Sequence, residues 1–198
     1  YWTWTIGISS LAAALLSPIF GSLSDQSQRS KFWLIISTLF YCLISFSFWF
    51  AAPNSLNIFI IILLIFIGNL SYEISQIFYN GQLKLITTKD NYAKLSGFAW
   101  GLGYVGTVII FLIYYGIFLL PEDPIFKLNN STFENIRISF PITGLWIILF
   151  SLPLFILFKD PKPKTISAGL DLKKSFNQLI VTFKNLQQYR NLILFLIA

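Results

Sequence analysis

The chain has 198 residues, of which 56% are hydrophobic and 11% are charged, whereas soluble domains carry roughly 25% charged residues. This composition excludes an ordinary soluble protein. The chain has no His and a single Cys, Cys42, so we expect no enzymatic activity, no metal site and no cofactor. The net charge is +6, and the charged residues lie in the segments that separate long uncharged runs. Because they do not form a basic face, this pattern argues against nucleic acid as a partner.

Long uncharged runs predict membrane-spanning helices, since about 20 apolar residues are needed to cross roughly 30 Å of hydrocarbon. The uncharged runs are residues 1–24, 32–83, 95–121 and 138–158, with Glu73 as the one charge inside the second run. That run is long enough for two helices, and Pro53-Asn54-Ser55 marks the break between them. We therefore expect an all-α bundle of five transmembrane helices in a lipid bilayer.

Both ends of the chain lie in apolar sequence. A fifth uncharged run, the start of a sixth predicted span, begins after Arg190 and stops at Ala198, which is too short to cross a bilayer. The chain begins with the apolar stretch Tyr1-Trp2-Thr3-Trp4 and contains no Met. We interpret the chain as a fragment of a longer membrane protein.

The distribution of Lys and Arg predicts the orientation, because these residues accumulate in cytoplasmic loops. Of the 14 Lys and Arg residues, Lys127 and Arg137 fall in the loop of residues 121–137, and the other twelve fall on the opposite side. The N-terminus is then outside. The external loop contains Asn130-Ser131-Thr132, a glycosylation acceptor only in a eukaryotic secretory setting, and we expect no other chemistry there.

The first cytoplasmic loop contains Gly21, Leu23, Asp25 and Arg29 at spacings that resemble the loop signature of the major facilitator superfamily. Gly21 allows close helix approach, and Asp25 either caps a helix or pairs with a cation. Such a pair holds one conformation of a two-state transporter, so these residues are candidates for a conformational gate. In the alternative, Arg29 and Lys31 only anchor the topology.

The third span carries polar residues at spacings of four, three and four, which place them on one helical face: Asn69, Glu73, Gln76 and Asn80. A carboxylate at mid-helix costs roughly 2.5–3.5 kcal/mol on insertion scales and usually faces a cavity or a partner. Glu73 is therefore the first candidate for a proton or substrate pathway, with Tyr72 and Tyr79 beside it. In the alternative, this stripe is a wetted helix end near Lys84.

The fourth span is rich in glycine, at Gly97, Gly101, Gly103 and Gly106. Each glycine costs a helix about 1 kcal/mol relative to Ala, so we expect these positions to serve close helix packing. The first span offers a matching face of small residues, namely Ser10, Ala14, Ser17 and Gly21. Trp100 and Tyr104 either line a cavity or fill the bundle core.

Three stretches together resemble the vacuolar amino-acid effluxer-like family of the major facilitator superfamily, whose founding members are autophagy-related permeases. They are Glu73 to Asn80, the glycine run from Gly97 to Gly106, and Tyr189-Arg190-Asn191-Leu192 with Phe195-Leu196. The resemblance implies helices two to six of a twelve-helix transporter that works by alternating access, with amino acids or similar small polar solutes as its substrates. The C-terminal half of the same protein is then the missing partner.

On this interpretation the chain has three parts. Residues 1–158 form five helices of the N-terminal half-bundle, residues 159–190 form a cytoplasmic linker, and residues 191–198 begin another span. The linker has one apolar face, made of Leu172, Phe176, Leu179, Ile180, Phe183 and Leu186. This pattern predicts a helix lying on anionic lipid headgroups, with binding to another protein as the alternative.

Two other classes of function stay open at this stage. A membrane scaffold or a decayed transporter gene would show the same hydropathy. An intramembrane enzyme is disfavoured, because no span carries paired carboxylates, Ser with His, or a metal-ligand cluster. The expected location is the inner membrane in a bacterium or the vacuolar membrane in a fungus.

Overall fold

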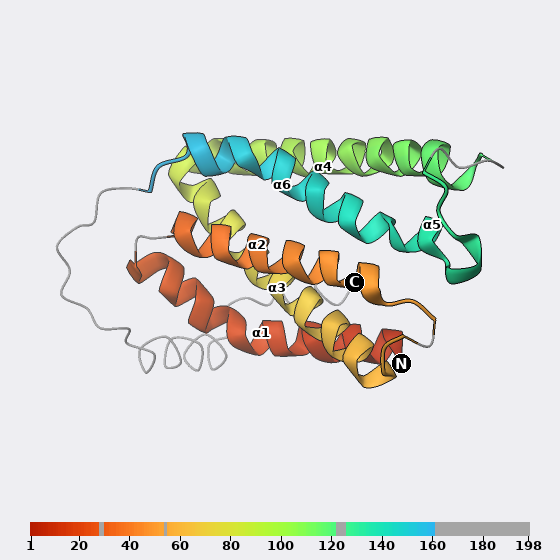
Figure 1. Ribbon diagram of the computed structural model, residues 1–198. Coiled ribbons are helices and arrows are strands. Elements are labelled where there is room, and N and C mark those ends of the chain that lie inside the picture. Colours follow the sequence, from red (N-terminus) through yellow and green to blue (C-terminus); the bar gives the residue numbers. More distant parts are fainter. Residues whose placement is uncertain (28–29, 54, 122–125, 161–198) are drawn as a thin grey trace, which may run out of the picture.

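The computed structural model describes residues 1–27, 30–53, 55–121 and 126–160, and these contain helices and no strands (Figure 1). The long helices are α1 (Trp2–Ser27), α2 (Ser30–Ser47), α3 (Ile58–Ile86), α4 (Tyr92–Tyr114) and α6 (Ser139–Leu157). The short elements are η1 (Phe48–Phe50), η2 (Lys89–Asn91), the π-helical turn η3 (Tyr115–Leu119), η4 (Asn130–Thr132) and α5 (Glu134–Arg137). The predicted all-α fold is confirmed.

Five helical segments in the described residues are long and apolar enough to cross a membrane. They are Trp2–Gly21, Ser30–Phe50, Ile58–Leu83, Tyr92–Leu119 and Glu134–Leu157. The predicted break near Pro53 is also correct, because η1 ends at Phe50 and α3 begins at Ile58. The Asn57 side chain caps α3 by accepting a hydrogen bond of 2.9 Å from the backbone N–H of Phe59. The protein is a multi-pass integral membrane protein.

Helix α3 packs along both α1 and α2, and α2 packs in turn on α6. The buried stripe of α1 is Thr5, Ser9 and Ala13, which lies one residue away from the small-residue face expected at Ser10, Ala14 and Ser17. Phe78 of α3 is fully buried, with its ring centroid 6.1 Å from that of Phe20 and 6.3 Å from that of Trp33. These contacts form the core of the described bundle.

Close helix approach occurs at three glycines that the sequence did not single out. A Cβ atom at Gly68 would lie 3.1 Å from Ile44 Cγ2, one at Gly81 would lie 3.1 Å from Ser24 Oγ, and one at Gly144 would lie 3.3 Å from the Phe46 ring. In the glycine run, a Cβ at Gly97, Gly101 or Gly103 would meet nothing within 4 Å, and one at Gly106 would meet only Trp146 Nε1 at 4.0 Å. Within the described residues the run makes no tight helix contact, and its packing role stays a prediction.

The α2–α6 pair is tied at one end by Lys31 at the start of α2. The Lys31 backbone N–H donates a hydrogen bond of 3.0 Å to Asp160 Oδ1, and its ammonium group donates one of 2.6 Å to the Phe158 carbonyl. An acceptor carboxylate at a helix N-terminus satisfies a free N–H and interacts favourably with the helix dipole. Lys31 therefore also joins two helices, beyond the topological role expected from sequence.

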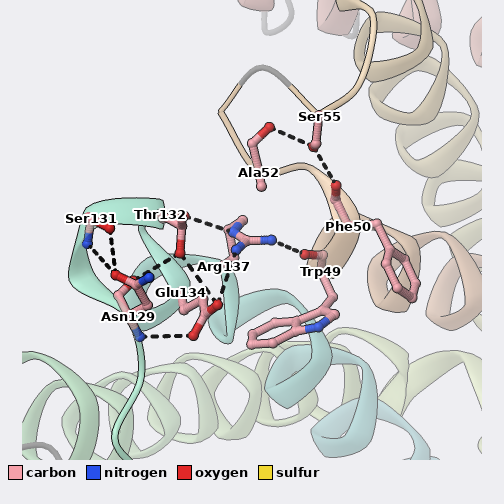
Figure 2. A network of polar contacts seen from close by, with 9 residues as sticks. All are labelled: Trp49, Phe50, Ala52, Ser55, Asn129, Ser131, Thr132, Glu134 and Arg137. Carbon is pink, nitrogen blue, oxygen red and sulfur yellow. Dashed lines mark hydrogen bonds and ion pairs between the residues drawn. The ribbon is translucent and has the colours of Figure 1, made fainter.

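The other end of this pair is tied by Arg137 of α5 (Figure 2). Its guanidinium group donates hydrogen bonds to the Trp49 carbonyl and, at 3.2 Å, to the Thr132 carbonyl. It also lies 5.3 Å from the centre of the Trp49 ring and 3.9 Å from the Glu134 carboxylate. The segment expected to be a plain external loop thus contains a short helix that fastens α6 to the end of α2.

Candidate functional site

A groove of about 360 Å³ lies between α3 and α4. The two helices come together at the end where η2 joins them (Figure 1). The walls of the groove bring together four of the six residues proposed from sequence for the solute or proton pathway: Gln76, Asn80, Trp100 and Tyr104. The remaining lining residues are Tyr72, Tyr79, Leu83, Ser96, Ala99, Gly103 and Thr107. Both helices therefore contribute one continuous face.

Helical periodicity explains this lining. On α3 the positions Tyr72, Gln76, Tyr79 and Leu83 recur at spacings of four, three and four. On α4 the positions Ser96, Trp100, Gly103 and Thr107 recur in the same way. Because Ala99 and Gly103 have little or no side chain, the α4 wall is hollow between the larger groups.

The groove is aromatic and polar but carries no formal charge on its lining residues. Four rings face it, from Tyr72, Tyr79, Trp100 and Tyr104. The Trp100 and Tyr104 ring centroids are 6.2 Å apart and their planes are inclined by 39°. Among the described residues, the side-chain amides of Gln76 and Asn80 make no hydrogen bond, so they are available to a solute.

The other two pathway candidates, Asn69 and Glu73, point toward α1 instead. The Asn69 amide nitrogen donates hydrogen bonds to Ser9 Oγ at 2.8 Å and to Ser10 Oγ at 3.2 Å. Ser10 Oγ in turn donates to Glu73 Oε1 at 3.4 Å. The single polar face expected on the third span is therefore divided between the α1 contact and the groove.

Glu73 is half-buried. Among the side chains that the structure describes, the one ion pair within 4.0 Å joins Arg137 to Glu134, so none of the described Lys and Arg side chains pairs with Glu73. The Glu73 side chain follows Tyr72 directly and precedes Gln76 by three residues. Along the axis of α3, Glu73 thus lies at the level of the groove, while its carboxylate accepts a hydrogen bond from Ser10 of α1.

The proposed gate residues fall at the edge of the described structure. Asp25 belongs to the last turn of α1, and Arg29 lies outside the described residues. A Cβ at Gly21 would meet nothing within 4 Å. The gate role of these three residues stays a prediction.

Sequence reasoning missed a second polar stripe on α3. Ser71, Ser75 and Gln82 are buried on the same face as Phe78, and Gln82 is only 1% exposed. Within the described residues, neither the nitrogen nor the oxygen of the Gln82 amide has a hydrogen-bond partner. The sequence did contain a signal for this stripe, because Ser71, Ser75, Phe78 and Gln82 recur at spacings of four, three and four. The sequence analysis started from the charged Glu73 and therefore did not consider these uncharged residues.

A family model described as "Vacuole effluxer Atg22 like" matches residues 1–198. The chain belongs to this family. The resemblance to the major facilitator superfamily, and to its effluxer-like branch, is confirmed.

Among curated proteins, the chain is similar to the "Uncharacterized MFS-type transporter YxiO" of Bacillus subtilis (strain 168), with 28% identity over 214 residues. The match covers 100% of this chain and 45% of that relative, so the chain spans less than half of the relative's length. No solved structure gives a significant match. Both descriptions name transport proteins, and the family is not one of enzymes.

The sequence also predicted the lack of a metal site and the presence of a linker helix. In the ranges that the structure describes, no group of three or more His, Cys, Asp or Glu residues could hold a metal ion. The linker helix and the start of the next span, residues 161–198, lie outside those ranges. The division of the chain into 1–158, 159–190 and 191–198 stays a prediction.

Proposed function

We propose that this chain is part of a secondary active transporter of the major facilitator type, and that the groove between α3 and α4 is a section of its solute pathway. The observation that carries this proposal is the convergence of Gln76, Asn80, Trp100 and Tyr104 on one groove. Polar side chains within membrane spans are costly and usually mark substrate or ion pathways. Here the side-chain amides of Gln76 and Asn80 share the groove with the rings of Trp100 and Tyr104, and they make no hydrogen bond among the described residues.

Amino acids or similar small polar solutes are the proposed substrates, and export is the proposed direction. A volume of about 360 Å³ is within the usual range for small-molecule sites, which runs from roughly 300 to 1,000 Å³. The amides and hydroxyl groups supply both donors and acceptors to a polar solute. The rest of the transporter would close the opposite side of the groove, as alternating access between two half-bundles requires.

Glu73 is proposed to carry a coupling proton or to balance a positive charge on the solute. Its support is that no described Lys or Arg side chain pairs with it and that its neighbours Tyr72 and Gln76 line the groove. A half-buried carboxylate that pairs with no cation is able to exchange a proton or attract a cation.

The test is uptake of radiolabelled amino acids by proteoliposomes that contain the full gene product. Tyr104→Leu removes a groove ring, and we expect it to lower the transport rate at least tenfold. Tyr115→Leu is the matched control, because Tyr115 is also an exposed ring of the same span but does not line the groove. Equal rates in the two variants, or no uptake of any amino acid by the wild type, would overturn the proposal.

A further inference from the structure

We propose that the groove between α3 and α4 binds the ammonium group of its solute on the faces of Trp100, Tyr104 and Tyr72, and that it has no site for a carboxylate. The inference rests on the proposed function and names the chemical group that this half of the transporter recognises. It would accept primary amines, quaternary ammonium compounds, or an amino acid held by its amino end.

The aromatic faces are the first support. Trp100, Tyr104 and Tyr72 line the same groove and expose 52%, 68% and 39% of their surface. The faces of such rings carry partial negative charge, and they attract a cation held within about 6 Å of the ring centre. Trp is the strongest of these partners, and the attraction grows when water is excluded.

The uncharged lining of the groove is the second support. No Lys, Arg, Asp or Glu lines it; in the sequence, Glu73 follows the lining residue Tyr72, Lys84 follows Leu83, and Lys94 precedes Ser96 by two residues. Recognition of an ammonium group therefore falls to the ring faces and to the amide oxygens of the lining. The oxygens of the Gln76 and Asn80 side chains can accept hydrogen bonds from an ammonium group.

The third support is that the groove lacks the features that hold carboxylates. Carboxylates are usually held by Arg, by Lys, or by free backbone N–H groups at a helix N-terminus or a broken helix. Helix α3 runs unbroken from Ile58 to Ile86, and α4 runs unbroken from Tyr92 to Tyr114. Along the groove their backbone N–H groups are therefore used within the helices. A solute carboxylate would have to be bound elsewhere.

The experiment measures equilibrium binding to the purified full gene product in nanodiscs by calorimetry. Three probes with the same branched five-carbon skeleton and different polar groups are compared, namely 3-methylbutylamine, 3-methylbutanol and 3-methylbutanoic acid. We expect the amine to bind at least tenfold more tightly than the alcohol, and the acid to show no binding. Equal binding of the amine and the acid would overturn the inference.

Two variants assign the binding to the ring faces. Trp100→Leu should weaken amine binding at least tenfold, and Trp100→Phe should restore part of it, because Phe keeps an aromatic face. Tyr115→Leu is the control and should bind the amine as the wild type does. Unchanged amine binding in Trp100→Leu would overturn the inference. Since binding is measured without transport, failure of the proposed function is seen separately, as absent uptake in proteoliposomes.

Discussion

The two sides of α3 use polar groups in different ways. Toward α1 the partners are small, and Asn69 bonds Ser9 and Ser10 at 2.8 and 3.2 Å across a close contact. Toward α4 there is a groove of about 360 Å³, which the large rings of Trp100 and Tyr104 line. On the proposed function, the polar residues of α3 serve packing where they meet small neighbours on α1, and they face the solute where they line the groove.

We call the side of α3 that packs on α1 the closed side and the side that faces α4 the groove side. The closed side also includes α2 and α6. Helix α2 packs on α3 and α6, and hydrogen bonds of Lys31 and Arg137 tie the two ends of the α2–α6 pair. By contrast, α4 makes sparse contacts with α3 and α6. We expect the closed side to behave as one stable unit, whereas the groove side should tolerate substitution but lose transport when its surface changes.

The largest expected effect on transport is that of Glu73→Gln, because Glu73 lies between the closed side and the groove side. In the full gene product we expect this change to abolish or uncouple transport at normal expression, because Gln keeps the size of Glu but does not ionise. Glu73→Asp should retain part of the activity. Uptake is measured across a pH series.

A purely structural Glu73 would behave otherwise. Replacing a buried charge by a neutral group would then leave insertion and transport unchanged or improved. Wild-type uptake with unchanged pH dependence in Glu73→Gln would assign Glu73 to the closed side alone.

A second prediction compares added bulk on the two sides. Ser9 is completely buried against α3, so Ser9→Leu should lower the free energy of unfolding by about 1–3 kcal/mol through overpacking. Thr107→Leu adds bulk to the open groove and should change stability by less than about 0.5 kcal/mol while it slows transport. Denaturant titration in detergent measures both. Equal destabilisation of the two variants would remove the distinction between the sides.

The third prediction concerns Arg137 at the outer tie. Arg137→Gln removes a charged donor to the Trp49 carbonyl and a ring contact, so we expect a loss of about 1.5–3 kcal/mol in the free energy of unfolding. Lys127→Gln is a matched control, because Lys127 is an exposed cation of the same loop. If the two variants have the same stability, the tie does not stabilise the α2–α6 pair.

The smallest expected effect is on the polar contact between α1 and α3. Asn69→Ala removes hydrogen bonds to Ser9 and Ser10, and such bonds between membrane helices average about 0.6 kcal/mol. Gln76→Ala on the groove side breaks no hydrogen bond in the described residues and should leave stability unchanged. A double-mutant cycle of Asn69 with Ser9 measures the coupling, and a coupling of zero would contradict the closed contact.

The sequence by itself determined the five spans and the break near Pro53, because crossing a bilayer depends on local length and apolarity. It also determined the family, through Glu73 to Asn80 and the glycine run. Four of its six pathway residues fall in one groove, since helical spacing alone groups Gln76 with Asn80 and Trp100 with Tyr104.

Only the tertiary structure decided which neighbour each face meets. The rotation of a helix about its axis is set by packing against its partners, and a rotation of one residue turns a side chain by about 100°. For this reason the buried stripe of α1 is Thr5, Ser9 and Ala13 instead of the face expected one residue later. On α3 the position along the helix decides the partner: Asn69 and Glu73 bond to α1, whereas Gln76 and Asn80, further along the same face, line the groove. Close helix approach likewise occurs at Gly68, Gly81 and Gly144.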